Sequence, residues 1–406
     1  MQKILRFSFL IILMLNESFQ KDDSLSSDQK KAIIRLHVFT SENNNKTFEI
    51  AFIQNANQTE FKLNSICDSK KSLLKFIIHG FAETWNMTNR WNWVKDMRNE
   101  MFKSNESSKL CIIIVDWKEL ARGGDHISNY WKAISNMKIA ADLLVKYFSV
   151  NIINEKNMHC IGFSLGCHMC SMFYKVYREK LKVKPARITG LDPAGPFFKD
   201  KPLSEKLNFN DASIVDIIHT SEHFGSGEKL GRVDFYIDNG TSEILACSKF
   251  KDRFDTSDRF ILYEEEAQNK STYTEVNLTE KQLEEQGGLK SLGKKFFNSI
   301  KNFFTSKPKR VFLSFHAFFG CSHLMAVRLF IFSINECTFK TYFCSSLNDF
   351  KKNSCDKTPT KLELPRLGYY ADRAVDYFQT YNVSVGSFFI RTRSNPPYCI
   401  DPNKKT

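Results

Sequence analysis

The chain has 406 residues, of which 42% are apolar and 14% aromatic, and its 58 Lys and Arg against 45 Asp and Glu give a net charge of +13. The apolar fraction is ordinary for a globular protein, and no segment reaches the roughly 18 consecutive apolar residues that a membrane-spanning helix requires. The positive charge favours an anionic lipid surface as a partner. No nucleic-acid-binding motif accompanies it, so we expect no nucleic-acid partner.

The N-terminus predicts a secretory signal peptide over residues 1–20. Lys3 and Arg6 precede an apolar run over residues 7–15, which is too short to span a bilayer. Eleven cysteines fit an oxidising compartment. Eight possible glycosylation sites fit the same route, at Asn45, Asn57, Asn86, Asn105, Asn239, Asn269, Asn277 and Asn382. We therefore expect a secreted, extracellular protein whose residues 21–406 form a single domain.

From about residue 33 to 250, short apolar runs alternate with segments of helical spacing. Strands are predicted over residues 73–78, 111–115, 158–161, 186–191 and 214–218. Helices are predicted over residues 130–148 and 168–180. Near-continuous apolar strands alternating with helices predict an α/β fold with a mostly parallel central sheet that is covered by helices on both faces.

One short motif indicates chemistry. Gly162-Phe163-Ser164-Leu165-Gly166 follows a predicted strand and precedes a predicted helix. Glycines two residues before and after a serine allow a sharp strand-to-helix turn that exposes the hydroxyl group. A motif of this kind can occur by chance in a chain of this length. Its position between a predicted strand and a predicted helix makes Ser164 the candidate nucleophile.

A serine nucleophile requires a base, and the base requires a carboxylate that orients it. Asp192 is the best-placed acid because it directly follows the predicted strand 186–191. Asp216 is the second choice, although its place inside a strand favours a structural role. The histidines that follow in the chain are His219, His223, His316 and His323. Composition does not choose among them, although the turn around His323 would hold an imidazole well.

Acyl transfer also requires backbone N–H groups directed at the developing oxyanion. Leu165, the residue after the nucleophile, provides one of them. The loop His79-Gly80-Phe81, which follows the predicted strand 73–78, offers the N–H group of Phe81 as the second.

Residues 248–320 interrupt the alternating pattern. Their first half is acidic, and their second half carries lysines and arginine without any Asp or Glu. Apolar residues from Leu289 to Phe304 recur at helical spacing between lysines, which predicts a basic amphipathic helix. Such a helix either lies in a lipid interface or packs its apolar face on the domain.

Motifs spread along the chain resemble those of the pancreatic lipase family. They are His79-Gly80-Phe81, Val115-Asp116-Trp117, the Ser164 motif, Gly190-Leu191-Asp192-Pro193-Ala194, Ile218-His219-Thr220, Asp234-Phe235-Tyr236, Gly320-Cys321-Ser322-His323-Leu324 and Gly368-Tyr369-Tyr370-Ala371-Asp372. The resemblance runs from about residue 34 to the end, apart from residues 248–320. It implies an α/β-hydrolase fold, a catalytic triad of Ser164, Asp192 and His323, and an oxyanion hole formed by the N–H groups of Phe81 and Leu165.

Within that family, the chain resembles the secreted phospholipases A1 of arthropods. It ends soon after Pro396-Pro397-Tyr398-Cys399, so we expect no C-terminal β-sandwich domain and no colipase partner. The loop from Ser221 to Gly231 is short, as in phospholipases. Phe163 occupies a position where triglyceride lipases usually have histidine.

Other features depart from the family. Residues 248–320 correspond to the lid, which is short in phospholipases but long here. The resemblance implies disulfides Cys247–Cys321, which closes the lid, and Cys344–Cys355. Cys337–Cys399 and Cys67–Cys111 are further predictions, and Cys160, Cys167 and Cys170 are expected to be free thiols in the core. Where the family binds calcium, this chain has Leu203, Asn208 and Asp211, so we expect neither a metal ion nor another cofactor.

The sequence therefore predicts a serine esterase that hydrolyses the sn-1 acyl ester of phospholipids at a membrane or micelle surface. A triglyceride lipase of the same fold is the alternative, because the long lid favours it. A non-catalytic lipid-binding protein of the yolk-protein kind is an alternative of another class, which the order of Ser164, Asp192 and His323 disfavours.

Overall fold

The computed structural model describes residues 32–43, 48–53, 63–81, 83–85, 91–122, 128–149, 153–221, 224–238, 244, 247, 261–264, 273–275, 311–313, 320–355, 364–373 and 386–400. Several sequence predictions lie outside these residues, namely the signal peptide, the basic helix of residues 289–304, His223, His316 and every glycosylation site except Asn105. Asn105 is exposed in a turn.

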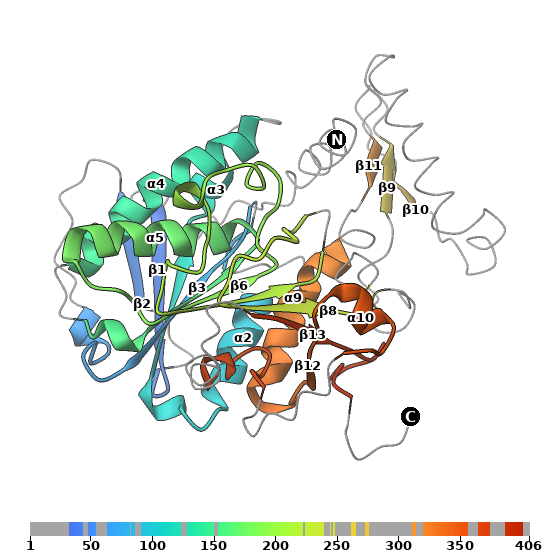
Figure 1. The fold of residues 1–406 in the computed structure, drawn as a ribbon. Helices are drawn as coiled ribbons and strands as arrows, with labels where there is room; N and C mark the ends of the chain where they lie inside the picture. Colours follow the sequence, from blue (N-terminus) through green and yellow to red (C-terminus); the bar gives the residue numbers. More distant parts are fainter. Residues whose placement is uncertain are drawn as a thin grey trace. The chain divides into compact units, whose positions relative to one another are not determined.

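A mixed β-sheet is the centre of the fold (Figure 1). In the described part of the chain it has ten strands in the order β12-β13-β8-β7-β6-β5-β3-β4-β1-β2. Its strands are β1 (Ala32–Thr40), β2 (Phe48–Ile53), β3 (Leu73–Ile78), β4 (Leu110–Asp116), β5 (Met158–Phe163), β6 (Arg187–Leu191), β7 (Ile214–His219), β8 (Val233–Ile237), β12 (Thr341–Phe343) and β13 (Gly386–Ile390). The pairings from β13 through to β4 are parallel, whereas β1, β2 and β12 join the edges antiparallel.

Helices cover both faces of this sheet. They are α2 (Trp93–Phe102), α3 (Lys118–Arg122), α4 (Ser128–Ser149), α5 (Leu165–Leu181), α9 (Gly320–Asn335) and α10 (Leu347–Lys351). Figure 1 shows α4 and α5 on one face and α2 and α9 on the other. The layered α/β arrangement and every strand predicted from residue 73 to 218 are therefore confirmed. None of the described helices is both long and apolar enough to cross a membrane.

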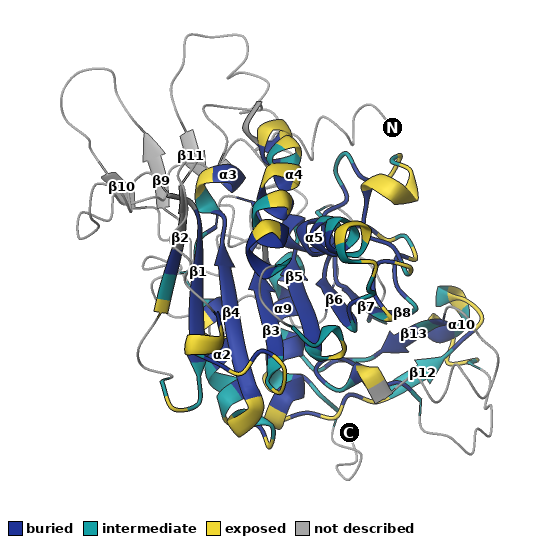
Figure 2. Ribbon diagram, turned by 90° about the vertical axis from the view of Figure 1, so that its left-hand side faces the viewer, coloured by how far each residue is buried: buried dark blue, intermediate teal, exposed yellow. Residues whose placement is uncertain are grey.

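The central strands are buried, β4 and β5 along their whole length and β3 apart from its first residue, Leu73 (Figure 2). Their β-branched and aromatic side chains suit a sheet that is packed on both faces. Between the sheet and its helices, the Phe76 ring of β3 meets Phe148 of α4 and Phe173 of α5 edge-on, with centroids 5.1 and 5.5 Å apart. This packing holds α4 and α5 against β3.

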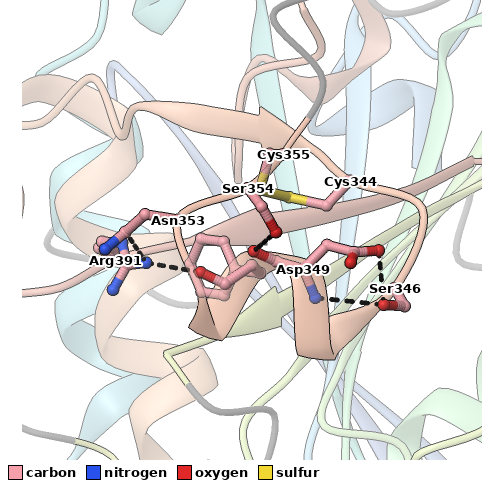
Figure 3. The surroundings of a disulfide bond; sticks show 8 residues. Cys344, Ser346, Asp349, Asn353, Ser354, Cys355 and Arg391 are labelled. Atoms are coloured by element: carbon pink, nitrogen blue, oxygen red, sulfur yellow. Dashed lines mark hydrogen bonds between the residues drawn. A yellow bond between two sulfur atoms is a disulfide. The ribbon is translucent and has the colours of Figure 1, made fainter.

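Disulfides fix several connections. Cys67–Cys111, Cys337–Cys399 and Cys344–Cys355 form as predicted, and Cys247 and Cys321 are also disulfide-bonded. Figure 3 shows Cys344–Cys355 beside α10, where Arg391 donates a hydrogen bond to the carbonyl oxygen of Phe350 (2.7 Å).

The expectation that Cys160 and Cys170 are free was wrong. The two residues form a disulfide with a Cα–Cα distance of 5.8 Å. The sharp turn after β5 folds α5 back onto its own strand, which brings these positions together although ten residues separate them. Cys167 is free and buried, and burial raises the pKa of its thiol well above the ordinary value, so it is no thiolate nucleophile.

Residues 250–321 form a compact unit of their own. Its described residues include a three-stranded antiparallel sheet in the order β10-β9-β11, with β9 at Ile261–Glu264, β10 at Tyr273–Glu275 and β11 at Val311–Leu313.

Candidate active site

Ser164 lies at the turn from β5 into α5. Its backbone has φ 55° and ψ −119°, a conformation that non-glycine residues rarely adopt. The neighbouring glycines make the turn possible, because a Cβ on Gly162 would lie 2.3 Å from the Gly166 carbonyl oxygen. A Cβ on Gly166 would lie 2.2 Å from the carbonyl oxygen of Ile78. The Gly-x-Ser-x-Gly motif therefore forms the strand-turn-helix that the sequence predicts, and it leaves Ser164 partly exposed.

Asp192 follows the end of β6, the strand beside β5. Its carboxylate is fully buried and accepts hydrogen bonds from the backbone N–H groups of Thr220 (2.9 Å) and Ser221 (3.0 Å) at Oδ1. Its other oxygen, Oδ2, lies 2.6 Å from Nδ1 of His323. The two backbone donors fix the position of the carboxylate, which in turn orients the imidazole.

His323 lies in the first turn of α9, and its side chain is 13% exposed. Its ring centroid lies 4.6 Å from that of Phe163, the residue before Ser164. The backbone N–H group of Ser164 donates a hydrogen bond to the carbonyl oxygen of Leu191 (3.1 Å), and the carbonyl oxygen of Ser164 accepts one from the N–H group of Ala194 (3.3 Å). The Ser164 backbone is therefore bonded to residues on either side of Asp192 in the sequence. The structure thus brings together Ser164, which follows β5, Asp192, which follows β6, and His323 of α9.

The loop after β3 lies against the same turn. A Cβ on Gly80 would lie 3.1 Å from Cβ of Ser164, so the next residue, Phe81, is close to the candidate nucleophile. The N–H group of Gly80 donates to Glu83 (2.8 Å), and the ring of Trp117 donates to the carbonyl oxygen of His79 (2.9 Å). These bonds fix the backbone that carries the predicted oxyanion donor of Phe81.

The second-choice residues have other partners. Asp216 is buried in β7, where it accepts two hydrogen bonds from Arg187, at 2.7 and 3.1 Å. His219 is buried at the end of β7, and its Nε2 lies 2.7 Å from Asp234. Asp216 thus has the structural partners that its place inside a strand predicts, and His219 is held by a different acid from His323.

Several contacts of the site were not predicted. The amides of Thr220 and Ser221 carry no sequence signature, because every residue except proline offers an N–H group. The ring of Phe224, in the loop after β7, stacks near His323 with centroids 5.5 Å apart. Only the shortness of that loop, a feature taken from the resemblance, pointed to it.

The residues at the family's calcium position do not fit a metal ion. The ammonium group of Lys175, which the sequence reading missed, lies 3.4 Å from the Asp211 carboxylate and 3.1 Å from the carbonyl oxygen of Leu203. A divalent cation could not use these oxygens while the ammonium group holds them, since like charges at contact distance repel strongly.

Comparisons with known proteins identify the family of the chain. The family model described as Lipase matches residues 3–259 and 309–398. Lipase member H of Mus musculus is 27% identical over 345 residues, which cover 83% of this chain and 59% of that protein. Pancreatic lipase-related protein 2 of Cavia porcellus is 34% identical over 240 residues, which cover 55% of this chain and 49% of that protein. The chain therefore spans about half to three fifths of the length of these relatives.

Solved structures of esterases resemble the chain more distantly. An esterase of Pyrobaculum calidifontis is 12% identical, with a TM-score of 0.27, over 55% of this chain and 73% of that one. The sheet order, the Ser164 turn and the family match identify the fold as that of the α/β-hydrolases, as predicted.

Proposed function

Because the chain belongs to the lipase family, we propose that it is a secreted serine esterase that hydrolyses the sn-1 acyl ester of phospholipids at a lipid surface. One observation carries the proposal. The Asp192 carboxylate holds Nδ1 of a partly exposed His323 beside the strained turn that presents Ser164. A nucleophile, a base and an orienting acid in that arrangement perform acyl transfer.

In the proposed reaction, Ser164 Oγ attacks the ester carbonyl carbon while Nε2 of His323 takes its proton. The N–H groups of Phe81 and Leu165 stabilise the oxyanion of the tetrahedral intermediate. The ester C–O bond then breaks, and the lysophospholipid leaves with the proton from His323. Water attacks the acyl-enzyme, again giving its proton to His323, and the fatty acid leaves as Ser164 regains its hydrogen.

Three features favour a phospholipid as the substrate. The loop 221–231 is short and carries Phe224 against His323, and the net charge of +13 favours a phospholipid surface. These features, with Phe163, support the phospholipase A1 branch. The triglyceride lipase remains the alternative, because the segment that corresponds to the family's lid, residues 248–320, is long. A non-catalytic lipid carrier is disfavoured, since it would have no use for an Asp192–His323 pair at the serine turn.

Secretion is supported by the disulfides, which persist in oxidising compartments, and by the exposed Asn105 of an Asn-x-Ser site.

An exposed tryptophan that packs on a partly buried phenylalanine supports contact with a lipid surface. Trp131 of α4 is 44% exposed, and its ring lies 4.0 Å from that of Phe197. Tyr130 contacts Phe197 on one side (5.7 Å) and Phe81 on the other (5.3 Å), so the apolar side chains continue from the surface to the predicted oxyanion loop. Trp favours membrane interfaces, and the exposed Lys132 next to it would meet anionic headgroups.

The test is fatty-acid release by the purified protein from phosphatidylcholine vesicles and from trioleoylglycerol emulsions, with Ser164→Ala as the matched control. We expect release from phosphatidylcholine that falls at least about 10⁴-fold in Ser164→Ala. Release from trioleoylglycerol alone would exclude the phospholipase, and no serine-dependent release from either lipid would exclude the enzyme.

A further inference from the structure

Four oxygen groups surround the ammonium group of Lys175, a residue of α5. Lys175 Nζ donates hydrogen bonds to the carbonyl oxygens of Lys206 (2.6 Å) and Leu203 (3.1 Å) and to Ser171 Oγ (2.9 Å). The Asp211 carboxylate lies 3.4 Å away and accepts a hydrogen bond from the same Ser171 hydroxyl (2.7 Å). We call Ser171, Lys175, Leu203, Lys206 and Asp211 the ammonium cluster.

Oxygen ligands of this kind are those that hard cations use in proteins, namely carbonyl, hydroxyl and carboxylate groups. Ser171 and Asp211 are almost fully buried, and the Lys175 side chain is 17% exposed. Without a cation, each of these acceptors would lose a donor and the buried carboxylate would lose its counter-charge, which is costly.

The Asn208 side chain completes the cluster as a donor. Its Nδ2 donates to the carbonyl oxygen of Leu203 (2.7 Å) and to Asp211 Oδ1 (3.1 Å). A carboxylate at this position would add the negative charge that a divalent ion needs. With an amide there, the single charge of Lys175 balances the single charge of Asp211.

The segment held by the ammonium cluster supports the candidate active site. The N–H group of Leu207, directly after Lys206, donates to His168 Nδ1 (3.1 Å). The other ring nitrogen of His168 lies 2.9 Å from the carbonyl oxygen of Ala194, two residues after Asp192. The buried His168 ring thereby connects the segment 203–211 to the backbone that carries the proposed catalytic acid.

We infer that Lys175 is a covalently attached cation that replaces a divalent metal ion in this chain, so that the segment 203–211 is fixed without calcium. This inference concerns folding and does not depend on the proposed esterase activity. If Lys175 has this role, chelators do not change the stability of the protein. Removing the ammonium group and supplying a carboxylate should then convert the cluster into a metal site.

Thermal unfolding of the full chain, in EDTA and in millimolar calcium, tests the inference. We expect the same melting temperature for the wild type in both buffers. Lys175→Met, which keeps the unbranched side chain up to the position of Cε but removes the ammonium group, should melt about 5 °C lower in both. Lys201→Ala is the matched control, because Lys201 pairs with Glu205 at the exposed surface of the same segment and should change the melting temperature by less than about 1 °C.

The double variant Lys175→Ala with Asn208→Asp should melt low in EDTA and recover several degrees in calcium, whereas Asn208→Asp alone should not respond to calcium. A wild-type melting temperature that rises in calcium by several degrees would overturn the inference, and this measurement needs no variant that folds. Wild-type stability of Lys175→Met, or a double variant that ignores calcium, would also overturn it.

Discussion

Two histidine–aspartate pairs in this molecule have nearly the same bond but different surroundings. In the first, Asp192 lies 2.6 Å from His323, and in the second, Asp234 lies 2.7 Å from His219. Both carboxylates are fully buried, and each also accepts hydrogen bonds from two neighbouring backbone N–H groups. The environment of the acid therefore does not distinguish the pairs.

The second ring nitrogen distinguishes them. Nδ1 of His219 lies 2.6 Å from the carbonyl oxygen of Ser226, and its side chain is 2% exposed, so the whole imidazole is used to connect β7 with the following loop. His323 uses Nδ1 for Asp192 and is 13% exposed, which leaves Nε2 for a reacting proton. The loop that His219 fixes carries Phe224, which contacts His323. The structural pair thus supports the candidate catalytic pair.

Replacing each acid by its amide is the strongest test of this comparison. Asp192→Asn should lower kcat by about 10⁴-fold, because the amide no longer selects the tautomer that accepts the serine proton. Asp234→Asn should leave most of the activity per folded molecule but lower the melting temperature by several degrees, because it disrupts a buried charged bond. Ester hydrolysis and thermal unfolding, measured on both variants, separate the two effects.

Equal loss of kcat in the two variants would show that Asp234 is as close to the chemistry as Asp192, and the comparison would fail. The two substitutions are matched controls for one another, since both replace a buried acid that is bonded to histidine.

The pH dependence of stability also separates structural histidines from the candidate catalytic His323, because structural histidines such as His168 are buried. Burial lowers the pKa of His168 to about 3, with its neighbouring lysines acting in the same direction. The folded pKa lies below the ordinary value of 6.5, so the unfolded chain takes up the proton first and stability falls as the pH drops from about 6.5 towards 3. His168 should therefore remove about 2 kcal/mol of unfolding free energy between pH 7 and pH 5.

Urea unfolding at the two pH values measures this loss. In His168→Gln, which cannot be protonated, the difference between pH 7 and pH 5 should be smaller by about 2 kcal/mol, even though the variant is less stable at pH 7. The same pH difference in wild type and variant would mean that His168 is not a buried neutral imidazole.

Most of the fold could be predicted because local sequence determines it. The runs of β3 to β7 are nearly continuous in apolar residues, and Gly162 and Gly166 mark the serine turn because only glycine fits there. The antiparallel β1, β2 and β12 were not predicted, since the alternating pattern of strand and helix does not reveal how edge strands pair.

The site was harder to predict because its bonds cross the chain. Asp192 could be chosen from its place at the end of a strand, but His323 is 131 residues away and was one of four histidines until the resemblance selected it. The Cys160–Cys170 bond and the contacts of Lys175 depend on how α5 packs, which neither composition nor spacing shows.

His323 also differs from His219 in that a substrate can reach it. Changes at Trp131 test how vesicle lipid reaches His323, and we expect the smallest effect from them. The chain has five tryptophans, of which only Trp131 is exposed. The side chains of Trp93 and Trp117 are buried, and those of Trp85 and Trp91 are partly buried. The fluorescence of Trp131 should therefore shift to the blue when the protein binds anionic phospholipid vesicles, including in Ser164→Ala, where catalysis is absent.

Trp131→Ala should weaken vesicle binding several-fold and lower hydrolysis of vesicle lipid by a similar factor, while hydrolysis of a soluble short-chain ester stays the same. Phe48→Ala is the matched control, since Phe48 is an exposed aromatic residue of β2, at the edge of the sheet. The soluble ester reaches His323 without a surface, so an equal loss on both substrates would place Trp131 in the packing of the oxyanion loop through Tyr130. Equal weakening by Phe48→Ala would mean that lipid binds without preference for α4.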